Sequence, residues 1–353
     1  MSVGHCTRLL RSPEEMQETV ALQQEIWHSP GVEVMPVHAL LATSKNGGQV
    51  LGAFVDGALA GMTVGMAAWR DGQRFLLSHM AGVHPRFQGS GIGTALKSRQ
   101  REIARDAGYR SIRWTFDPLQ RGNANFNFRL PGVSSDRYYV DYYGEMEDGI
   151  NAGLPSDRLE AHWPTRGRRR RKSPAPASPD QLLLASNREG HPEHSGPGES
   201  EDVTGIEIPG SLAVLKEKDP SLALDWRLAV REAFVTAFAR GFRAVDFISM
   251  DERPVYVLAA PQPWYLYVLQ CSDGSLYTGI SVDVQRRLGQ HQAGKGAVYT
   301  AMRRPLRLLA FWRYTGQGAA RRAEAGFKQL PRAAKFDQIA SATTWQGGKH
   351  QRL

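Results

Sequence analysis

The sequence has little cysteine and no long apolar run. Its 353 residues include two cysteines, Cys6 and Cys271, which are too few for a disulfide framework or a cysteine-based metal cluster. No apolar run approaches the roughly 20 residues of a bilayer-spanning helix, and residues 1–11 lack the apolar stretch of a secretory signal. These absences predict a cytoplasmic protein without a membrane partner.

Acidic residues are scarce only in the last quarter of the chain. Residues 261–353 hold 14 Lys and Arg but 4 Asp and Glu, whereas residues 1–260 hold 30 and 31. The net charge of +9 therefore comes from the C-terminal part. A compact basic module favours a polyanionic partner such as nucleic acid, and a surface charged only for solubility is the alternative.

Composition also indicates the domain boundaries. Between residues 164 and 203 a basic run is followed by sequence rich in Ser, Pro, Ala, Gly and Glu. Apolar side chains there are too sparse to offset the entropy cost of ordering, which predicts a disordered insertion. Prolines at positions 261 and 263 mark a second boundary. The predicted domains are residues 5–260 with that insertion, residues 263–341, and a tail at 342–353.

The N-terminal domain alternates strand and helix patterns. Strands are predicted at residues 49–55, 59–68 and 74–83, and Asp56-Gly57 between the first two is a strong hairpin turn. A long helix is predicted at residues 221–242, because apolar residues recur there with helical spacing. The fold class is therefore α/β.

A glycine-rich loop follows the strand that ends at Val83. Its glycines let backbone N–H groups approach an anion closely. The N-terminus of the following helix, which runs to about Ala107, adds a favourable dipole. A loop that only turns the chain is the alternative. The predicted cofactor-binding residues are Gln88, Gly89, Ser90, Gly91, Ile92 and Gly93.

This loop resembles the acyl-CoA loop of the GNAT acetyltransferase superfamily, because Gln88-x-x-Gly91-x-Gly93 stands between a strand and a helix. The resemblance implies a mixed sheet flanked by helices, acetyl-CoA or another acyl-CoA as cofactor, and N-acyltransferase activity. Many members place a tyrosine general acid where this chain has Phe128, whose ring has no proton to donate. Substitute acids are Tyr138, Tyr139, Tyr142 and Tyr143, and candidate general bases are Glu33, Asp117 and Glu145.

The C-terminal domain has the pattern of a small α/β core. Strands are predicted at residues 264–270, 276–280 and 306–314, and helices at residues 284–292 and 319–330. Arg287 and His291 are four positions apart, so they share one face of the first helix. Glu324 is the lone acid of the second helix.

This domain resembles the GIY-YIG nuclease superfamily over nearly its whole length. The shared spacing is Tyr277-x-Gly279, then Arg287 after seven residues, then His291 after three. Two positions depart from the motif of the name, with Tyr265 at its first glycine and Thr278 at the isoleucine of its second half. The resemblance implies a three-stranded α/β nuclease that cuts nucleic acid, with DNA the expected substrate.

The residue types suit phosphodiester cleavage, and the predicted catalytic residues are Tyr267, Tyr277, Arg287, His291 and Glu324. Glu324 is a carboxylate that can hold Mg²⁺ or Mn²⁺ together with a substrate phosphate. Arg287 offers a planar fork of donors to phosphate oxygens. Tyr267 and Tyr277 orient or deprotonate the attacking water, and His291 is either an alternative base or a partner that holds a tyrosine.

Two hypotheses account for these motifs. The first is a metal-dependent endonuclease fused to an acyl-CoA-dependent N-acyltransferase. The second is a non-catalytic nucleic-acid-binding module coupled to a domain that senses acyl-CoA, and Phe128 motivates it. Binding of acyl-CoA without turnover would separate the second hypothesis from the first.

Overall fold

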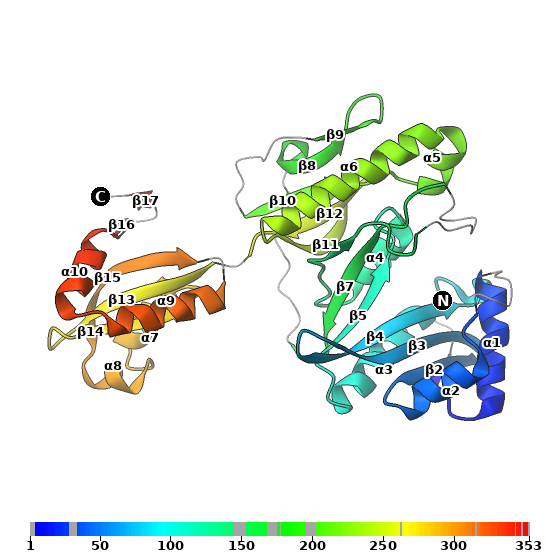
Figure 1. Cartoon of the computed structure of the whole chain (residues 1–353), viewed down its shortest axis with the longest axis horizontal. Helices are drawn as coiled ribbons and strands as arrows, with labels where there is room; N and C mark the ends of the chain where they lie inside the picture. The colour runs from blue at the N-terminus through cyan, green and yellow to red at the C-terminus, as the bar shows by residue number, and fades with distance from the viewer. Residues whose placement is uncertain are drawn as a thin grey trace. The chain divides into compact units, whose positions relative to one another are not determined.

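The computed structural model describes residues 4–27, 34–144, 153–167, 175–176, 178–194, 202–261, 263–314, 316–342, 344–346 and 349–351. The chain forms two compact units, an N-terminal unit (Met1–Ala259) and a C-terminal unit (Ala260–Leu353). Both combine helices with β-sheets, so the predicted α/β class is confirmed (Figure 1). None of the described helices is both long and apolar enough to cross a bilayer.

The N-terminal unit begins with a seven-stranded sheet in the order β1-β2-β3-β4-β5-β7-β6. Its strands are β1 (Cys6–Leu9), β2 (Gln49–Val55), β3 (Ala58–Arg70), β4 (Gln73–Val83), β5 (Ser111–Phe116), β6 (Tyr138–Tyr139) and β7 (Arg158–Pro164), and its helices are α1 (Pro13–Trp27), α2 (Val37–Lys45), α3 (Ile92–Asp106) and α4 (Arg121–Arg129). The β2–β3 hairpin turns at Asp56 and Gly57, both with positive φ. Of these pairings, β4 with β5 is parallel.

Successive side chains of a strand point to opposite faces of this sheet, and helices cover both faces. Val50 packs with Met16 of α1 and Leu40 of α2, whereas the next residue, Leu51, packs with Ile92 and Leu96 of α3. The α3 helix therefore covers the face opposite α1 and α2. Its N-terminus is fixed next to β4 through the short 3-10 turn η1 (Pro85–Phe87).

A five-stranded sheet in the order β11-β12-β10-β8-β9 completes the N-terminal unit. Its elements are η2 (Pro179–Gln181), β8 (Leu182–Ser186), β9 (Pro192–His194), β10 (Val203–Glu207), α5 (Leu212–Lys218), α6 (Pro220–Ala239), β11 (Arg243–Met250) and β12 (Arg253–Ala259). Asp219 caps α6 by accepting a hydrogen bond from the Leu222 amide at 2.9 Å, and Pro220 occupies the first turn.

The prediction of a disordered insertion at residues 164–203 is wrong where β8 and β9 lie. The β8 strand pairs in parallel with β10, and Leu182 and Leu184 are fully buried. Three consecutive leucines supply enough apolar surface to order a short strand once a neighbouring strand is available. Residues 168–174, 177 and 195–201 of the predicted insertion lie outside the described residues.

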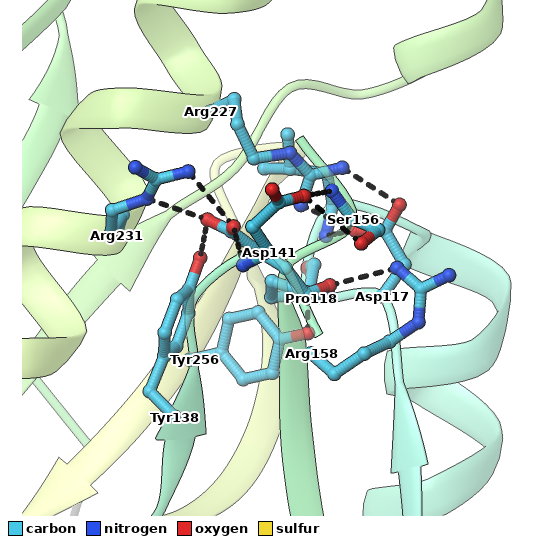
Figure 2. Close-up of polar contacts among 11 residues, drawn as sticks. Asp117, Pro118, Tyr138, Asp141, Ser156, Arg158, Arg227, Arg231 and Tyr256 are labelled. Carbon is cyan, nitrogen blue, oxygen red and sulfur yellow. Dashed lines mark hydrogen bonds and ion pairs between the residues drawn. The ribbon is translucent and has the colours of Figure 1, made fainter. Parts of the chain in front are cut away.

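Buried ion pairs connect α6 to the strands beside it (Figure 2). Arg227 donates two hydrogen bonds of 2.8 Å to the Asp117 carboxylate, and both side chains are almost fully buried. Arg231 pairs with Asp157 at 2.9 Å, and the Tyr138 hydroxyl donates to the same carboxylate at 2.8 Å. Asp117 follows β5 and Asp157 precedes β7, so this network holds α6 against the edge of the first sheet.

The C-terminal unit is built on a three-stranded antiparallel sheet in the order β14-β13-β15. Its elements are β13 (Trp264–Cys271), β14 (Leu276–Ser281), α7 (Val284–Gln292), α8 (Val298–Met302), β15 (Pro305–Tyr314), α9 (Gln317–Gln329), α10 (Arg332–Ala340), β16 (Thr344–Gln346) and β17 (Lys349–Gln351). Leu266 and Val268 of the central strand β13 pack against Phe327 of α9, whereas Tyr267 and Leu269 point to the opposite face.

Candidate functional site

The central strand of the C-terminal unit carries a buried tyrosine that bonds to a buried histidine. Tyr267 lies opposite Gly279 of β14, and its side chain is 1% exposed. The Tyr267 hydroxyl lies 2.9 Å from Nε2 of His291, which α7 carries in its last turn. His291 is fully buried as well. The cross-strand pairing and the start of α7 at the Asp283 cap thus fix the two rings together.

A threonine on α8 determines which nitrogen of His291 carries the proton. The Thr300 hydroxyl donates to the carbonyl of Ala297 at 2.9 Å, so its oxygen is left to accept. His291 Nδ1 lies 2.6 Å from that oxygen and must be the donor. Nε2 therefore has a free lone pair and accepts the hydrogen bond from the Tyr267 hydroxyl. No local sequence signal identified Thr300, because its role depends on how α8 folds beside α7.

The other predicted catalytic residues lie around this pair. Tyr277 of β14 is half-buried, with its ring centroid 5.0 Å from that of His291 and 6.4 Å from that of Tyr267. Arg287 of α7 is half-buried, donates to Gln290 Oε1 at 2.9 Å and lies close enough to Tyr267 to lower the pKa of its hydroxyl. Glu324 of α9 is close enough for its charge to act on Tyr267, and its carboxylate pairs with Lys328 at 2.7 Å. Tyr277 and Arg287 thus lie beside the Tyr267–His291 pair, whereas Glu324, on the helix that packs against the other face of β13, acts on Tyr267 through its charge.

Burial and charge set the protonation of the Tyr267–His291 pair. Burial is the main cause that raises the pKa of Tyr267 to about 12, and the charges of Tyr277 and Glu324 add to it, while Arg287 opposes them. Burial first, and then the charge of Arg287, lowers the pKa of His291 from 6.5. At neutral pH the pair is therefore a protonated phenol that donates to a neutral imidazole.

This protonation state predicts how phosphodiester cleavage, the activity expected from the sequence, would depend on pH. A lowered histidine pKa means that His291 stays neutral down to below pH 6.5. Below its pKa, Nε2 gains a proton and can no longer accept one from Tyr267, so the cleavage rate should fall about tenfold per pH unit. A rate–pH profile at saturating metal checks this. A cleavage rate that stays constant below pH 6.5 would contradict the pairing of Tyr267 with His291. The Thr300→Val variant should shift the midpoint of the pH profile, since it removes the acceptor for Nδ1–H of His291.

Two glycines make room for the buried rings. A Cβ at Gly279 would lie 2.5 Å from the Tyr267 hydroxyl oxygen, and a Cβ at Gly296 would overlap the His291 ring. Contacts that short do not occur without displacement of one partner. This steric demand explains the Tyr-x-Gly spacing of the sequence.

We expect Gly279→Ala to lower the cleavage rate by about a hundredfold, because it moves the Tyr267 hydroxyl away from Nε2. The matched control is Gly289→Ala on α7, where a Cβ meets nothing within 4 Å. That substitution should leave activity unchanged and stabilise the helix slightly. Initial rates of both purified variants, with circular dichroism to confirm folding, check the expectation. Equal rates in the two variants would contradict it.

The donor set fits a metal that is shared with a substrate. Within the described residues, no group of three or more His, Cys, Asp or Glu side chains could enclose a metal ion. Glu324 supplies one carboxylate, and its side chain is 21% exposed. Mg²⁺ keeps several waters and binds through one or two carboxylates plus substrate phosphate, so a lone carboxylate is compatible with it.

The glycine-rich loop of the N-terminal unit is shaped to receive an anion. Gly89 and Gly91 have φ values of 76° and 93°, and a Cβ at either would meet nothing within 4 Å. Gly91 is the N-cap of α3, and Ala95 donates the first backbone bond that closes on it. Ser90 between the two glycines donates its amide to the Phe87 carbonyl at 3.3 Å. The amides without an intrahelical acceptor are those of Ile92, Gly93 and Thr94 in the first turn of α3. The Ile92 side chain is buried in the core, so only the backbone of this residue faces the loop.

A cleft of about 490 Å³ opens where β4 and β5 separate. These parallel strands pair Leu76 with Ile112 and Leu77 with Arg113. Ser78 and Trp114, the next residue on each strand, line the cleft. The cleft is lined by residues of α1, β4, α3, β5, α4 and the segment after β6. They include Trp27, Ser78, His79, Met80, Lys97, Trp114, Phe116, Asn123, Phe126, Asn127 and Tyr143.

The structure separates the candidate acids and bases of this cleft. Phe128 is buried against Phe116 and Tyr256, is not among the residues that line the cleft, and has no proton to donate. Of the four substitute tyrosines, Tyr143 lines the cleft. Tyr138 and Tyr139 are occupied by bonds to Asp157 and Glu160, and Tyr142 is not among the residues that line the cleft. Asp117 is bound by Arg227. Glu33 and Glu145 lie outside the described residues.

Comparison with known proteins assigns both units. Residues 263–337 match the family model of the GIY-YIG catalytic domain. A UPF0213 protein of Streptococcus agalactiae serotype V is 53% identical over 77 residues, which are 22% of this chain and 88% of that protein. A UPF0213 protein of Cupriavidus pinatubonensis is 47% identical over 79 residues, 22% of this chain and 88% of that protein. The chain belongs to the GIY-YIG family. Its GIY-YIG domain coincides with the C-terminal unit.

The N-terminal unit matches a second family. Residues 13–126 match the model of the acetyltransferase (GNAT) family. Among solved structures, the Salmonella typhimurium protein yncA, solved with its cofactor acetyl-CoA, is 16% identical, with 48% of this chain and 99% of that chain covered and a TM-score of 0.37. The chain thus carries a GIY-YIG domain and a GNAT domain, each from a family of enzymes.

Proposed function

We propose that the protein cleaves phosphodiester bonds in nucleic acid, with DNA as its substrate, through its GIY-YIG domain and in the presence of a divalent metal. The observation that carries this proposal is the position of Tyr277 and Arg287 beside the buried Tyr267–His291 pair, with the charge of Glu324 acting on the same phenol. A net excess of ten basic residues in positions 261–353 complements the phosphate backbone.

The pair itself can move the proton of the attacking water. The Tyr267 oxygen accepts a proton from water as its own passes to Nε2 of His291, which becomes an imidazolium. Thr300 continues to accept from Nδ1–H throughout, so the ring does not need to turn. In this proposed step His291 has both of its expected roles, because it holds the tyrosine and receives its proton.

Arg287 and Glu324 would act on the phosphate. Arg287 offers a fork of charged donors next to Tyr267, where phosphoryl oxygens can be neutralised. Glu324 would hold Mg²⁺ or Mn²⁺, and the bound ion would supply further charge neutralisation at the phosphoryl oxygens. Tyr277, half-buried beside His291, would orient the water.

A cleavage panel tests this proposal. The full chain is incubated with Mg²⁺ or Mn²⁺ and labelled single strands, duplexes, flaps and branched DNA. We expect cut or nicked product with at least one substrate and none in EDTA. Tight binding without cleavage of any substrate would support the non-catalytic alternative instead.

We further propose that the GNAT domain binds acetyl-CoA or another acyl-CoA and transfers its acyl group to an amine. The outward amides at the start of α3 support a pyrophosphate site, and the cleft between β4 and β5 supports a site for the acyl arm. Tyr143 is the candidate acid for the departing thiolate, since it lines the cleft. Isothermal titration with acetyl-CoA checks the binding, and absence of heat at any concentration tested would contradict it.

A further inference from the structure

Lys97 is a buried lysine of the β4/β5 cleft. It lies on α3, is 3% exposed and lines the cleft. Its ammonium nitrogen donates to the Ser78 hydroxyl at 2.8 Å and lies 4.0 Å from the centre of the Trp114 ring. Ser78 and Trp114 are the residues at which β4 and β5 begin to part, so Lys97 contacts both walls where they meet.

The surroundings of Lys97 do not stabilise a positive charge by ion pairing. Within the described part of the chain, no carboxylate pairs with its amine, and burial is the one influence on its pKa, which it lowers to about 7. A large share of the side chain is therefore neutral amine at neutral pH. The other titratable groups that line the cleft are His79 of β4 and Tyr143.

Lys97 also lies within reach of a bound acyl group. It follows Gly91 by six positions on α3, which corresponds to about 9 Å along the helix axis. The pantetheine arm of a coenzyme A bound at the start of α3 is longer than this. An arm that enters the cleft would therefore pass its thioester by the part that Lys97 lines, where a neutral amine acts as a nucleophile.

We propose that Lys97 is a self-acylation site, at which the protein transfers the acyl group of its bound acyl-CoA to its own Nζ. The nitrogen lone pair attacks the thioester carbonyl carbon, the carbon–sulfur bond breaks and coenzyme A leaves. The proton lost by the nitrogen goes to the sulfur, so the products are Nε-acyl-Lys97 and free coenzyme A thiol. The amide retains one N–H, which can still donate to Ser78, and the buried positive charge disappears.

This inference rests on the proposed acyl-CoA binding, and the experiment separates the two. The full chain is incubated with acetyl-CoA at neutral pH, and acetylation is followed by intact mass and peptide mapping. We expect one acetyl group per chain, at Lys97, formed about tenfold or more faster than at the exposed Lys45 of α2, because a lowered pKa leaves more neutral amine. The rate difference between Lys97 and Lys45 should vanish in guanidinium, where the cleft is unfolded.

Two variants complete the test. Lys97→Arg keeps a donor toward Ser78 but has no nucleophilic amine, so it should lose the adduct and retain acetyl-CoA binding by calorimetry. Lys45→Arg should form the Lys97 adduct at the wild-type rate. Acetyl-CoA that binds wild-type protein without acetylating Lys97, or an adduct that forms equally fast in guanidinium, overturns the inference and leaves the acyl-CoA site intact. Absence of acetyl-CoA binding overturns both.

Discussion

Glu324→Gln should lower the rate of metal-dependent cleavage by about a thousandfold. The substitution keeps the size of the side chain and removes the one carboxylate that the site offers to a metal. Arg287→Ala should have a comparable effect, about a hundredfold to a thousandfold, because it removes a charged donor beside the phosphoryl oxygens. Initial rates over a range of Mg²⁺ concentrations check both variants.

The matched control for Glu324→Gln is Asp337→Asn, which neutralises an exposed acid on α10 of the same unit. This control has the same change of net charge, so it should bind nucleic acid as the Glu324 variant does and cleave at the wild-type rate. Cleavage that survives unchanged in both Glu324→Gln and Arg287→Ala would refute the site assignment.

Asp117→Asn should destabilise the N-terminal unit by about 3–5 kcal/mol, because it leaves the Arg227 guanidinium charged and buried without its counter-ion. Arg227 already has a buried Nε without a partner among the described atoms. The expected fall in Tm is about 10 °C for a unit of this size. Thermal unfolding followed by circular dichroism measures it.

The comparison that isolates burial is the exposed pair of Arg99 and Glu102, whose atoms are also 2.8 Å apart. Glu102→Gln should shift stability by less than about 1 kcal/mol, since solvent screens that pair. Replacing both buried partners, as in Asp117→Leu with Arg227→Met, should cost less than Asp117→Asn alone, because no unpaired charge remains. Equal shifts for the buried and exposed pairs would contradict this account.

Local patterns were sufficient for the C-terminal unit. Strands predicted at 264–270 and 276–280 are β13 and β14 to within one residue at either end, and the predicted helix at 284–292 has the bounds of α7. The features that these patterns predicted depend on residues close in sequence. They are the hairpin of this unit, the Asp283 cap, and the four-residue spacing that puts Arg287 and His291 on one face of α7. The position of Glu324 relative to the other four site residues depends on how α9 packs beside the sheet, and its role in the site was inferred from the family resemblance alone.

Patterns failed where tertiary contacts decide the structure. Averaged composition across residues 164–203 obscured the leucines of β8, whose order depends on pairing with β10. The sequence alone gives little indication that Lys97 is buried. It is a lysine that lies among the buried residues of α3, beside Leu96 and Gln100. The choice of Tyr143 among four tyrosines required knowledge of which one faces the cleft.

The short connection between the two units has a consequence for how the cell uses them. The last strand of the N-terminal unit ends at Ala259, and the first of the C-terminal unit begins at Trp264. One translation product therefore delivers both domains in a fixed one-to-one stoichiometry, whatever the level of gene expression. Tethering by so few residues also keeps each at a millimolar-range effective concentration around the other, far above what two separately made proteins would reach.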